Sequence, residues 1–250
     1  MARRSLLRTR SAALLLYVVG VPLVPSLAHA EQPLTPLQTT VSDSTLDRRI
    51  RFLEERLNGS RTHGQIWYWS WMTVDSVSAV FLGVSAGLAN HEDDAVNSGV
   101  NAGLSVIGIA DLLLRPLEAR HGADPIENLP EATREEKIAK VRAAEELLHA
   151  NAQRAEERTS LALHAGNVGL NAAAGTIVAL AGRQTDGLIT FATGTLGGVI
   201  NLLTAPWAPA RDWKDYEAFA GGSATVPTRW DVALAPMVDG GAHMALRVTW

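Results

Sequence analysis

The sequence predicts a mainly α-helical protein with two repeats, each an amphipathic helix followed by an apolar helical hairpin, and a C-terminal β-hairpin. Three observations predict this fold: apolar residues recur at helical spacing in two charged segments, four long segments carry almost no charge, and the C-terminal residues alternate between apolar and polar. In chain order we expect a signal peptide at 1–30, a linker at 31–43, a helical repeat at 44–116, a connection at 117–130, a helical repeat at 131–206, a linker at 207–227 and a β-hairpin at 228–250.

The composition excludes several classes of function. The 250 residues include 22 Lys and Arg against 26 Asp and Glu, whereas a chain that binds nucleic acid carries a basic patch and a high pI. The absence of Cys excludes disulfides, Cys-ligated metal centres and a thiol nucleophile. The sequence also lacks the motifs of serine hydrolases, zinc proteases, P-loop proteins and dinucleotide-binding enzymes. We therefore expect no enzymatic activity, no cofactor, no metal site and no nucleic-acid partner.

The first thirty residues predict a secretory signal peptide. Four Arg precede the apolar stretch Ala12–Leu27, and Ala28-His29-Ala30 has the small-x-small pattern of a cleavage site. Cleavage before Glu31 removes four of the 22 basic residues, leaving 18 against 26 acidic residues, a net charge of −8. An uncleaved anchor helix is the alternative. Either interpretation places the protein in the cell envelope.

The first repeat begins with a charged helix. Ser44-x-x-Asp47 fits a capping box, and apolar residues follow at spacings of three and four: Leu46, Ile50, Leu53 and Leu57. We expect this helix to end near Asn58-Gly59. Two apolar segments, Gln65–Asn90 and Ser98–Leu114, follow it, and the polar residues His91–Asp94 between them predict a solvated turn.

The second repeat has the same order of segments. Thr133-x-x-Glu136 predicts a capping box for a charged helix that reaches about Arg158. The apolar segments Ser160–Gly182 and Gly187–Ala205 come next. The residues Asp111–Pro116 and Asn201–Pro206 share the pattern [DN]-L-L-x-x-P at equivalent points, which indicates an internal repeat.

The four apolar segments are long enough to be transmembrane helices, because ~20 apolar residues span a hydrocarbon core of ~30 Å. They also carry small residues four apart, which allow close helix packing in lipid. These helix-packing residues are Gly83, Gly87, Gly99, Gly103, Gly169, Ala173, Gly194 and Gly198. The lipid bilayer is the partner that this composition favours.

Aromatic residues cluster near the start of the first apolar segment and after the end of the last one: Trp67, Tyr68, Trp69, Trp71, Trp207 and Trp213. They fit an interfacial aromatic belt, or alternatively ordinary core aromatics. Charge argues against a simple inner-membrane bundle. With the signal removed, the basic connection Arg115–Arg158 would lie outside, contrary to the positive-inside rule. A soluble periplasmic bundle therefore remains an alternative.

A few polar residues interrupt the apolar segments. At ~1.5 Å per residue, the expected hairpins bring several of them into one layer near the aromatic ends. These residues are Asp75, Asp111, His164, Asn167 and Asn201. Since an Asp costs ~2.5–3.5 kcal/mol near the centre of a bilayer, we expect the aspartates to pair with His164. The layer is either a site for an ion, proton or small ligand, or a set of hydrogen bonds that fixes helix register.

The C-terminal residues predict a β-hairpin whose turn contains Asp239-Gly240-Gly241. One face would carry apolar residues: Trp230, Val232, Leu234, Val238, Ala242, Met244, Leu246, Val248 and Trp250. A lone hairpin is marginal in water, so this face must pack on the helices, at a membrane interface or on other copies in a homo-oligomer.

These patterns favour a non-enzymatic, exported cell-envelope membrane protein with periplasm-facing segments and a structural or interaction role. The first alternative is translocation of an ion, proton or small molecule through the polar layer. The second is a soluble periplasmic helical bundle that binds an apolar ligand.

Overall fold

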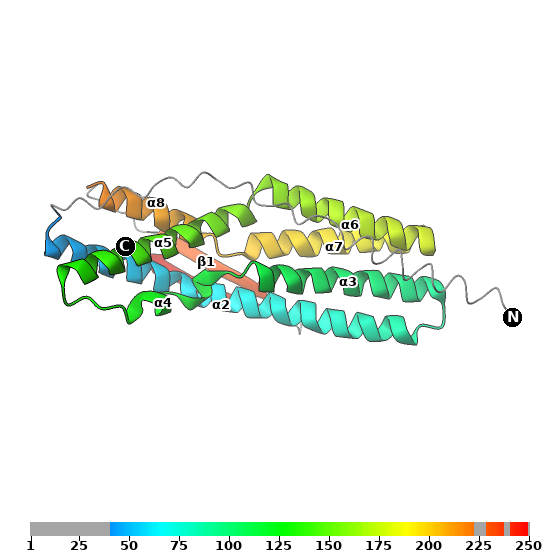
Figure 1. Ribbon diagram of the computed structural model, residues 1–250. Coiled ribbons are helices and arrows are strands. Elements are labelled where there is room, and N and C mark those ends of the chain that lie inside the picture. Colours follow the sequence, from blue (N-terminus) through cyan, green and yellow to red (C-terminus); the bar gives the residue numbers. More distant parts are fainter. Residues whose placement is uncertain (1–40, 223–228, 238–240, 250) are drawn as a thin grey trace. The chain divides into compact units, whose positions relative to one another are not determined.

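The computed structural model describes residues 41–222, 229–237 and 241–249, and this part of the chain is mainly helical (Figure 1). The expected signal peptide at 1–30 lies outside the described residues. The elements are α2 (Asp43–Leu88), α3 (Glu92–Leu114), η1 (Glu118–His121), α4 (Asp124–Glu127), α5 (Arg134–Arg158), α6 (Leu161–Ala181), α7 (Gln184–Thr204), α8 (Ala208–Ala220), β1 (Arg229–Pro236) and β2 (Ala242–Thr249).

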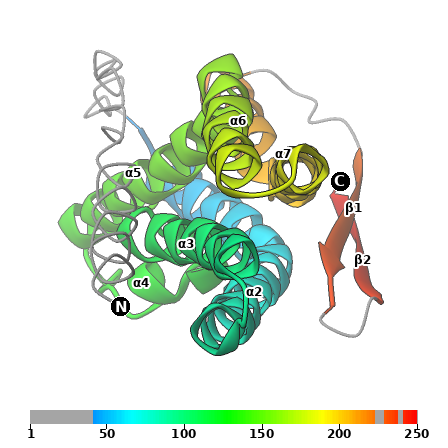
Figure 2. The ribbon, with the colours of Figure 1, turned by 90° about the vertical axis from the view of Figure 1, so that its right-hand side faces the viewer.

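The helices form two sections that share α2. In the polar section, the part of α2 up to Trp71 packs against α5, α8 and η1, with α4 against α5 (Figure 1). In the apolar section, the rest of α2 pairs with α3, α6 pairs with α7, and α3 joins the two hairpins by packing against α6. Figure 2 looks along these four helices. The single long helix α2 therefore runs through both sections.

Our prediction that the first charged helix ends near Asn58-Gly59 is wrong, because α2 runs unbroken for 46 residues. The polar and small residues there serve contacts with the connection rather than a helix end. The Asn58 Oδ1 atom accepts a hydrogen bond from the backbone N–H of Ala123 at 2.9 Å. A Cβ atom on Gly64 would lie 2.9 Å from the backbone nitrogen of Arg120 in η1. Glycine at this position thus lets two backbones approach each other.

The apolar stripes of the charged helices form the core of the polar section, as their spacing predicts. The buried residues are Leu46, Ile50, Leu53 and Leu57 of α2 and Val141, Leu148 and Ala152 of α5. The capping box of Thr133 and Glu136 at the start of α5 is confirmed. At α2 the helix instead begins at Asp43 after Ser42, without a side-chain cap.

The segment 207–227, which we expected to be a linker, contains α8. This helix packs against α5 and α2. Its aromatic residues contact Phe52 of α2, with ring centroids 4.6 Å apart for Phe219 and 6.0 Å apart for Tyr216. The helix was missed because it is short and its charged residues mask the apolar positions. It completes the core of the polar section.

The expected aromatic belt divides between two environments. Trp67, Tyr68 and Trp71 are buried in a cluster with residues of α3, η1 and the end of α7, so they belong to the core. Trp69 and Trp207 are exposed. Trp213 is half-buried against the rings of His149 and Tyr216 in the polar section. The belt interpretation therefore remains applicable only to Trp69 and Trp207.

The strands β1 and β2 pair antiparallel, with Val232 opposite Leu246. β1 contacts α2 and α7 (Figure 2). Residues 238–240 of the expected turn and Trp250 lie outside the described residues. The side chains of Trp230, Val232, Met244 and Leu246 are exposed. The apolar face of the strand pair is thus not covered by the described helices.

Candidate functional site

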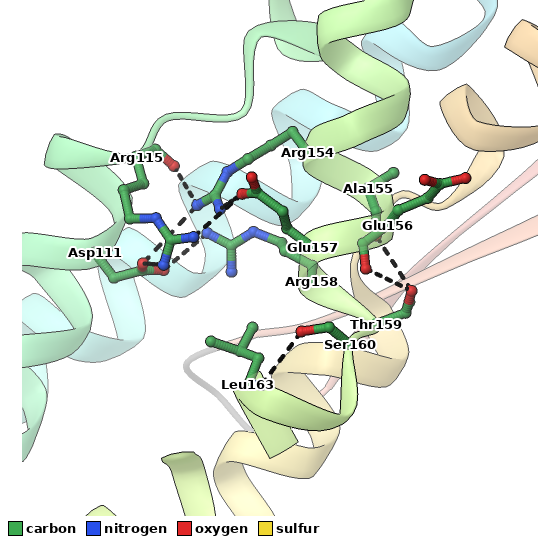
Figure 3. A network of polar contacts seen from close by, with 10 residues as sticks. All are labelled: Asp111, Arg115, Arg154, Ala155, Glu156, Glu157, Arg158, Thr159, Ser160 and Leu163. Carbon is green, nitrogen blue, oxygen red and sulfur yellow. Dashed lines mark hydrogen bonds and ion pairs between the residues drawn. The ribbon is translucent and has the colours of Figure 1, made fainter. Parts of the chain in front are cut away.

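A network of charged side chains lies where the two sections meet (Figure 3). Asp111, in the last turn of α3, accepts a hydrogen bond from Arg158, the last residue of α5, with Nη2 and Oδ2 2.8 Å apart. Two further guanidinium groups approach the same carboxylate, Arg115 at 3.5 Å and Arg154 at 3.8 Å. The negative charge of Asp111, at the end of an apolar helix, is therefore compensated by three guanidinium groups.

Glu157 brings a second carboxylate to the network. It accepts hydrogen bonds from Arg115 at 3.2 Å and from Arg154 at 3.0 Å. Arg154 also donates to the backbone oxygen of Arg115 at 2.7 Å, where α3 ends. Three guanidinium groups thus face two carboxylates. Their excess positive charge lies at the C-terminus of α3, the end of a helix that favours cations.

Arg158 is the most deeply buried member of this network, with its side chain 3 % exposed. Its guanidinium carbon lies 4.5 Å from the centre of the Trp67 ring. Burial lowers the pKa of Arg158 to about 10, against the opposing effect of Asp111, so the group stays protonated at neutral pH. Trp67 in turn donates its indole N–H to the backbone oxygen of Asn201 at 3.2 Å. The network therefore connects α2, α3, α5 and α7.

The expected polar layer is only partly assembled. Asp111 belongs to the network, and Asn201 reaches it through its backbone oxygen. The Asp75 carboxylate lies against Gly108 of α3. We expected His164 to pair with the aspartates, but arginines take that place at Asp111, and the His164 side chain makes no hydrogen bond or ion pair within the described residues. Asn167 instead donates to the backbone oxygen of Thr195 in α7 at 3.2 Å.

The sequence did contain a signal for the residues that we missed. Arg154, Glu157 and Arg158 are three and four positions apart, so they share one face of α5. They also come directly before the first apolar residues of α6. A charged face at the boundary of an apolar segment is thus the feature that marks this network.

Polar side chains also connect the helices inside the apolar section. Asn101 of α3 donates to the Thr190 hydroxyl of α7 at 3.3 Å, and that hydroxyl donates to Asn97 at 3.2 Å. Within α6, the Asn171 amide donates to the Asn167 side chain at 2.8 Å. The Asn101–Thr190–Asn97 contacts therefore hold α3 against α7, whereas the buried Thr195 hydroxyl of α7 has no hydrogen-bond partner among the described residues.

The predicted small-residue positions fall into two groups. Gly194 and Gly198 lie directly against the side chains of Asn171 and Asn167, and a Cβ on Gly99 would lie 3.9 Å from Ala86. The other predicted positions do not contact a neighbouring helix: a Cβ on Gly83, Gly87, Gly103 or Gly169 would meet no atom within 4 Å, and Ala173 is exposed.

The polar section contains further buried charged side chains, among them Glu145. Tyr216 of α8 donates its hydroxyl to Glu145 of α5, and Arg49 of α2 lies 3.8 Å from the same carboxylate. Burial raises the pKa of Glu145, and burial together with the Glu145 hydrogen bond raises the pKa of Tyr216. This contact joins the three long helices of the polar section. Within the described residues, no group of three or more acidic or histidine side chains has the arrangement of a metal site.

Three helical segments of the described chain are long and apolar enough to cross a membrane: 43–88, 92–114 and 184–220. We expected four, but α6 does not qualify. Its 21 residues include His164, Asn167 and Asn171, which lower its hydropathy. No protein-family model, no curated protein and no solved structure matches this chain. The class that fold and composition define is a helical protein with three candidate membrane spans.

Proposed function

We propose that this chain is an exported membrane protein of the cell envelope, without enzymatic activity, in which the apolar section lies in a bilayer and the polar section forms a contact surface outside it. The observation that carries this proposal is the distribution of side chains in the apolar section. Its interior combines amides and hydroxyls with a small apolar cluster that includes Val100 and Val178, while many of its large apolar side chains are exposed. A bundle with this arrangement suits lipid better than water.

The exposed apolar side chains come from all four helices of the apolar section. Phe81 is 69 % exposed, Leu188 65 % and Leu180 84 %. The set includes Val77, Val80, Phe81, Val84 and Leu88 of α2, Val106 of α3, Leu180 of α6 and Leu188, Ile189, Leu196 and Leu203 of α7. Complete burial of a fully exposed side chain of this size is worth about 1.5–3 kcal/mol, and each of these would gain the share that corresponds to its exposed surface. In a soluble bundle they would form the core, so their outward positions support insertion into lipid.

The dimensions of the apolar section also support this proposal. α3 has 23 residues and α6 and α7 have 21 each, which gives lengths of about 31–35 Å at 1.5 Å per residue. A hydrocarbon core is about 30 Å thick. The turns after α2 and α6 lie at the same end, since Arg183 is 4.0 Å from Asp94. The proposal has α6, which is less apolar than the three candidate spans, cross the bilayer packed against α7, so that four passes bring the chain back to the side of the polar section.

The polar contacts favour a structural or interaction role over translocation. Asp111 is compensated by three guanidinium groups, and the amides of α3 and α6 bond to neighbouring hydroxyl, amide and backbone groups. A translocation pathway needs polar groups that can exchange partners with the transported species. The expected signal peptide supports a periplasmic position for the polar section.

Fractionation tests this proposal. Membranes from cells that express the full chain are washed with alkaline carbonate and then extracted with detergent. We expect the protein to stay in the pellet through the carbonate wash and to appear in the detergent extract. Release by carbonate would overturn the proposal.

A pair of matched variants sharpens the fractionation. Replacing Val80, Phe81 and Val84 by Gln removes three exposed apolar side chains from α2. Replacing Arg48, Arg51 and Glu55 by Gln changes three exposed polar side chains of the same helix. If the apolar section lies in lipid, only the first variant is lost from the carbonate-resistant pellet. If both variants fractionate like the unmodified chain, the outward apolar face is not the membrane contact.

A further inference from the structure

A small pocket lies between α2 and η1. It has a volume of about 210 Å³ and is lined by Gln65, Tyr68, Trp69, Arg120 and His121. None of these residues belongs to the network around Asp111. The pocket combines one guanidinium group, two aromatic rings, an amide and an imidazole. The aromatic rings make most of the lining apolar, and the guanidinium of Arg120 is the group in it that can hold an anion.

Arg120 is held in place by contacts that leave its terminal nitrogens available. Its guanidinium carbon lies 4.0 Å from the centre of the Tyr68 ring, and its Nε donates a hydrogen bond to Nε2 of His121 at 3.0 Å. In the described part of the chain Arg120 forms no ion pair with a carboxylate. Nearby Arg61, in contrast, forms an ion pair with Asp124 at 2.7 Å. The Glu118 carboxylate approaches the pocket only through His121, whose Nε2 atom lies 3.8 Å from it, so the Arg120 guanidinium has no direct carboxylate partner.

The position of the pocket along α2 matches the headgroup layer of a bilayer. The sequence places the start of the apolar segment at Gln65, but the buried residues of α2 end at Trp71, so the proposed arrangement has the hydrocarbon begin after Trp71. Tyr68 and Gln65 precede Trp71 by three and six residues, which places them about 4.5–9 Å outside the hydrocarbon at 1.5 Å per residue. The headgroup layer occupies about 5–7 Å on each side of the hydrocarbon core. Trp69, at the rim of the pocket, is 62 % exposed, as an interfacial indole would be.

We infer that this pocket binds the phosphate group of an anionic phospholipid headgroup. The planar fork of Arg120 pairs with two phosphate oxygens, and the amide of Gln65 provides a further donor. The Arg120 guanidinium attracts the anionic phosphate of a phosphatidylglycerol headgroup, whereas a choline group would bring a second cation next to Arg120. This inference rests on the proposed function, since it places the pocket at a membrane surface.

Calorimetric titration of the full-length protein in a nonionic detergent tests the inference. The ligand is a short-chain phosphatidylglycerol below its micellar concentration, compared with the phosphatidylcholine of equal chain length and with inorganic phosphate. The main variant is Arg120→Gln. The matched control, Arg61→Gln, removes the same charge from an arginine that already has a carboxylate partner. Arg120→Lys keeps the charge without the fork and replaces Arg120→Gln if that variant does not fold.

We expect saturable binding of phosphatidylglycerol by the unmodified chain and by Arg61→Gln, and binding at least about tenfold weaker in Arg120→Gln or Arg120→Lys, the size of one charge-assisted contact. Phosphatidylcholine should bind more weakly than phosphatidylglycerol. The inference is overturned if phosphatidylglycerol does not bind, or if Arg120→Gln binds it like the unmodified chain. It is also overturned if inorganic phosphate displaces the lipid at equal concentration, because a free ion is then the ligand.

Failure of this inference can be separated from failure of the proposed function. If the protein is retained after the carbonate wash but the Arg120 variants bind lipid like the unmodified chain, the lipid-binding inference fails and the proposed function stands. Release by carbonate together with Arg120-dependent binding of the short-chain lipid overturns the membrane-embedded arrangement and leaves the phosphate site in place.

Discussion

The ion pair between Asp111 and Arg158 provides the sharpest test of how the two sections are held together. Arg158 is almost completely buried, whereas the Asp111 side chain is 30 % exposed. Asp111→Leu leaves the Arg158 guanidinium buried without its nearest carboxylate. Removal of one partner of a buried pair costs about 3–5 kcal/mol. We expect about 3 kcal/mol, the lower end of that range, because Asp111 is partly hydrated.

The reverse substitution, Arg158→Met, should cost less. Asp111 keeps Arg115 at 3.5 Å and Arg154 at 3.8 Å, and Met can pack against the Trp67 ring that Arg158 now covers. We expect a loss of about 1 kcal/mol. The double variant has no buried unpaired charge, so its loss should be about 2 kcal/mol instead of the additive value of about 4 kcal/mol.

The assay is reversible unfolding of the purified chain in mixed micelles by titration with a denaturing detergent, followed by far-ultraviolet circular dichroism. An exposed pair provides the control: Arg183 and Asp186 are 3.0 Å apart, and the Arg183 side chain is 66 % exposed. Variants of that pair should change the free energy of unfolding by less than about 1 kcal/mol. Additive losses at Asp111 and Arg158 would refute the conclusion that their contact holds the junction.

Three further predictions concern the packing, pH dependence and topology. Gly175→Val should destabilise the apolar section by about 1–3 kcal/mol in the same unfolding assay, because its Cβ would meet the Gly187 backbone of α7. Gly169→Val, where a Cβ meets no atom within 4 Å, should change the free energy of unfolding by less than about 0.5 kcal/mol. Equal losses in the two variants would contradict the packing of α6 on α7. Burial raises the pKa of Glu145 in the folded chain, so the free energy of unfolding should fall as the pH rises from below the ordinary pKa of Glu through the raised one. Thermal unfolding of Glu145→Gln at several pH values should lack this pH-dependent part of the stability. An unchanged pH profile in Glu145→Gln would refute the prediction. Since the chain has no Cys, single cysteines introduced at Asn90 and Glu55 can be labelled in intact cells with a maleimide that does not cross membranes. The proposed arrangement predicts labelling at position 55 alone. Labelling at both positions would contradict that arrangement.

Local patterns in the sequence predict the helices well because helical periodicity depends on near neighbours. Leu46, Leu53 and Leu57 are buried as their spacing predicts, and the capping box that starts α5 is present. The end of the first charged helix could not be predicted in this way. Asn58 contacts Ala123, which is 65 residues further along the chain, so a residue with the character of a helix stop serves a tertiary contact instead.

The position of Asp111 along its helix could be predicted from the sequence, but the side chains that pair with it could not. The rise per residue places Asp111 near the polar end of its helix, where the structure has it. Which side chain faces Asp111 depends on the rotation of each helix about its axis and on the crossing of α5 over α3, which the spacing of residues does not determine. His164 was the nearest candidate within the apolar segments, whereas Arg158 comes from the end of a charged helix.

The network at Asp111 has a consequence for the proposed membrane arrangement. An unpaired Asp in a bilayer is costly, but here three guanidinium groups from α3 and α5 reach the same carboxylate just where the apolar segments end. The long side chains of Arg115 and Arg154 can keep their charged ends toward the headgroup layer while Arg158 packs against Trp67. The same contacts tie the end of α5 to the end of α3, so the charge that permits Asp111 at the membrane boundary also fixes the polar section to the apolar section. Loss of Asp111 should therefore affect the orientation of the polar section before it affects the integrity of the apolar helices.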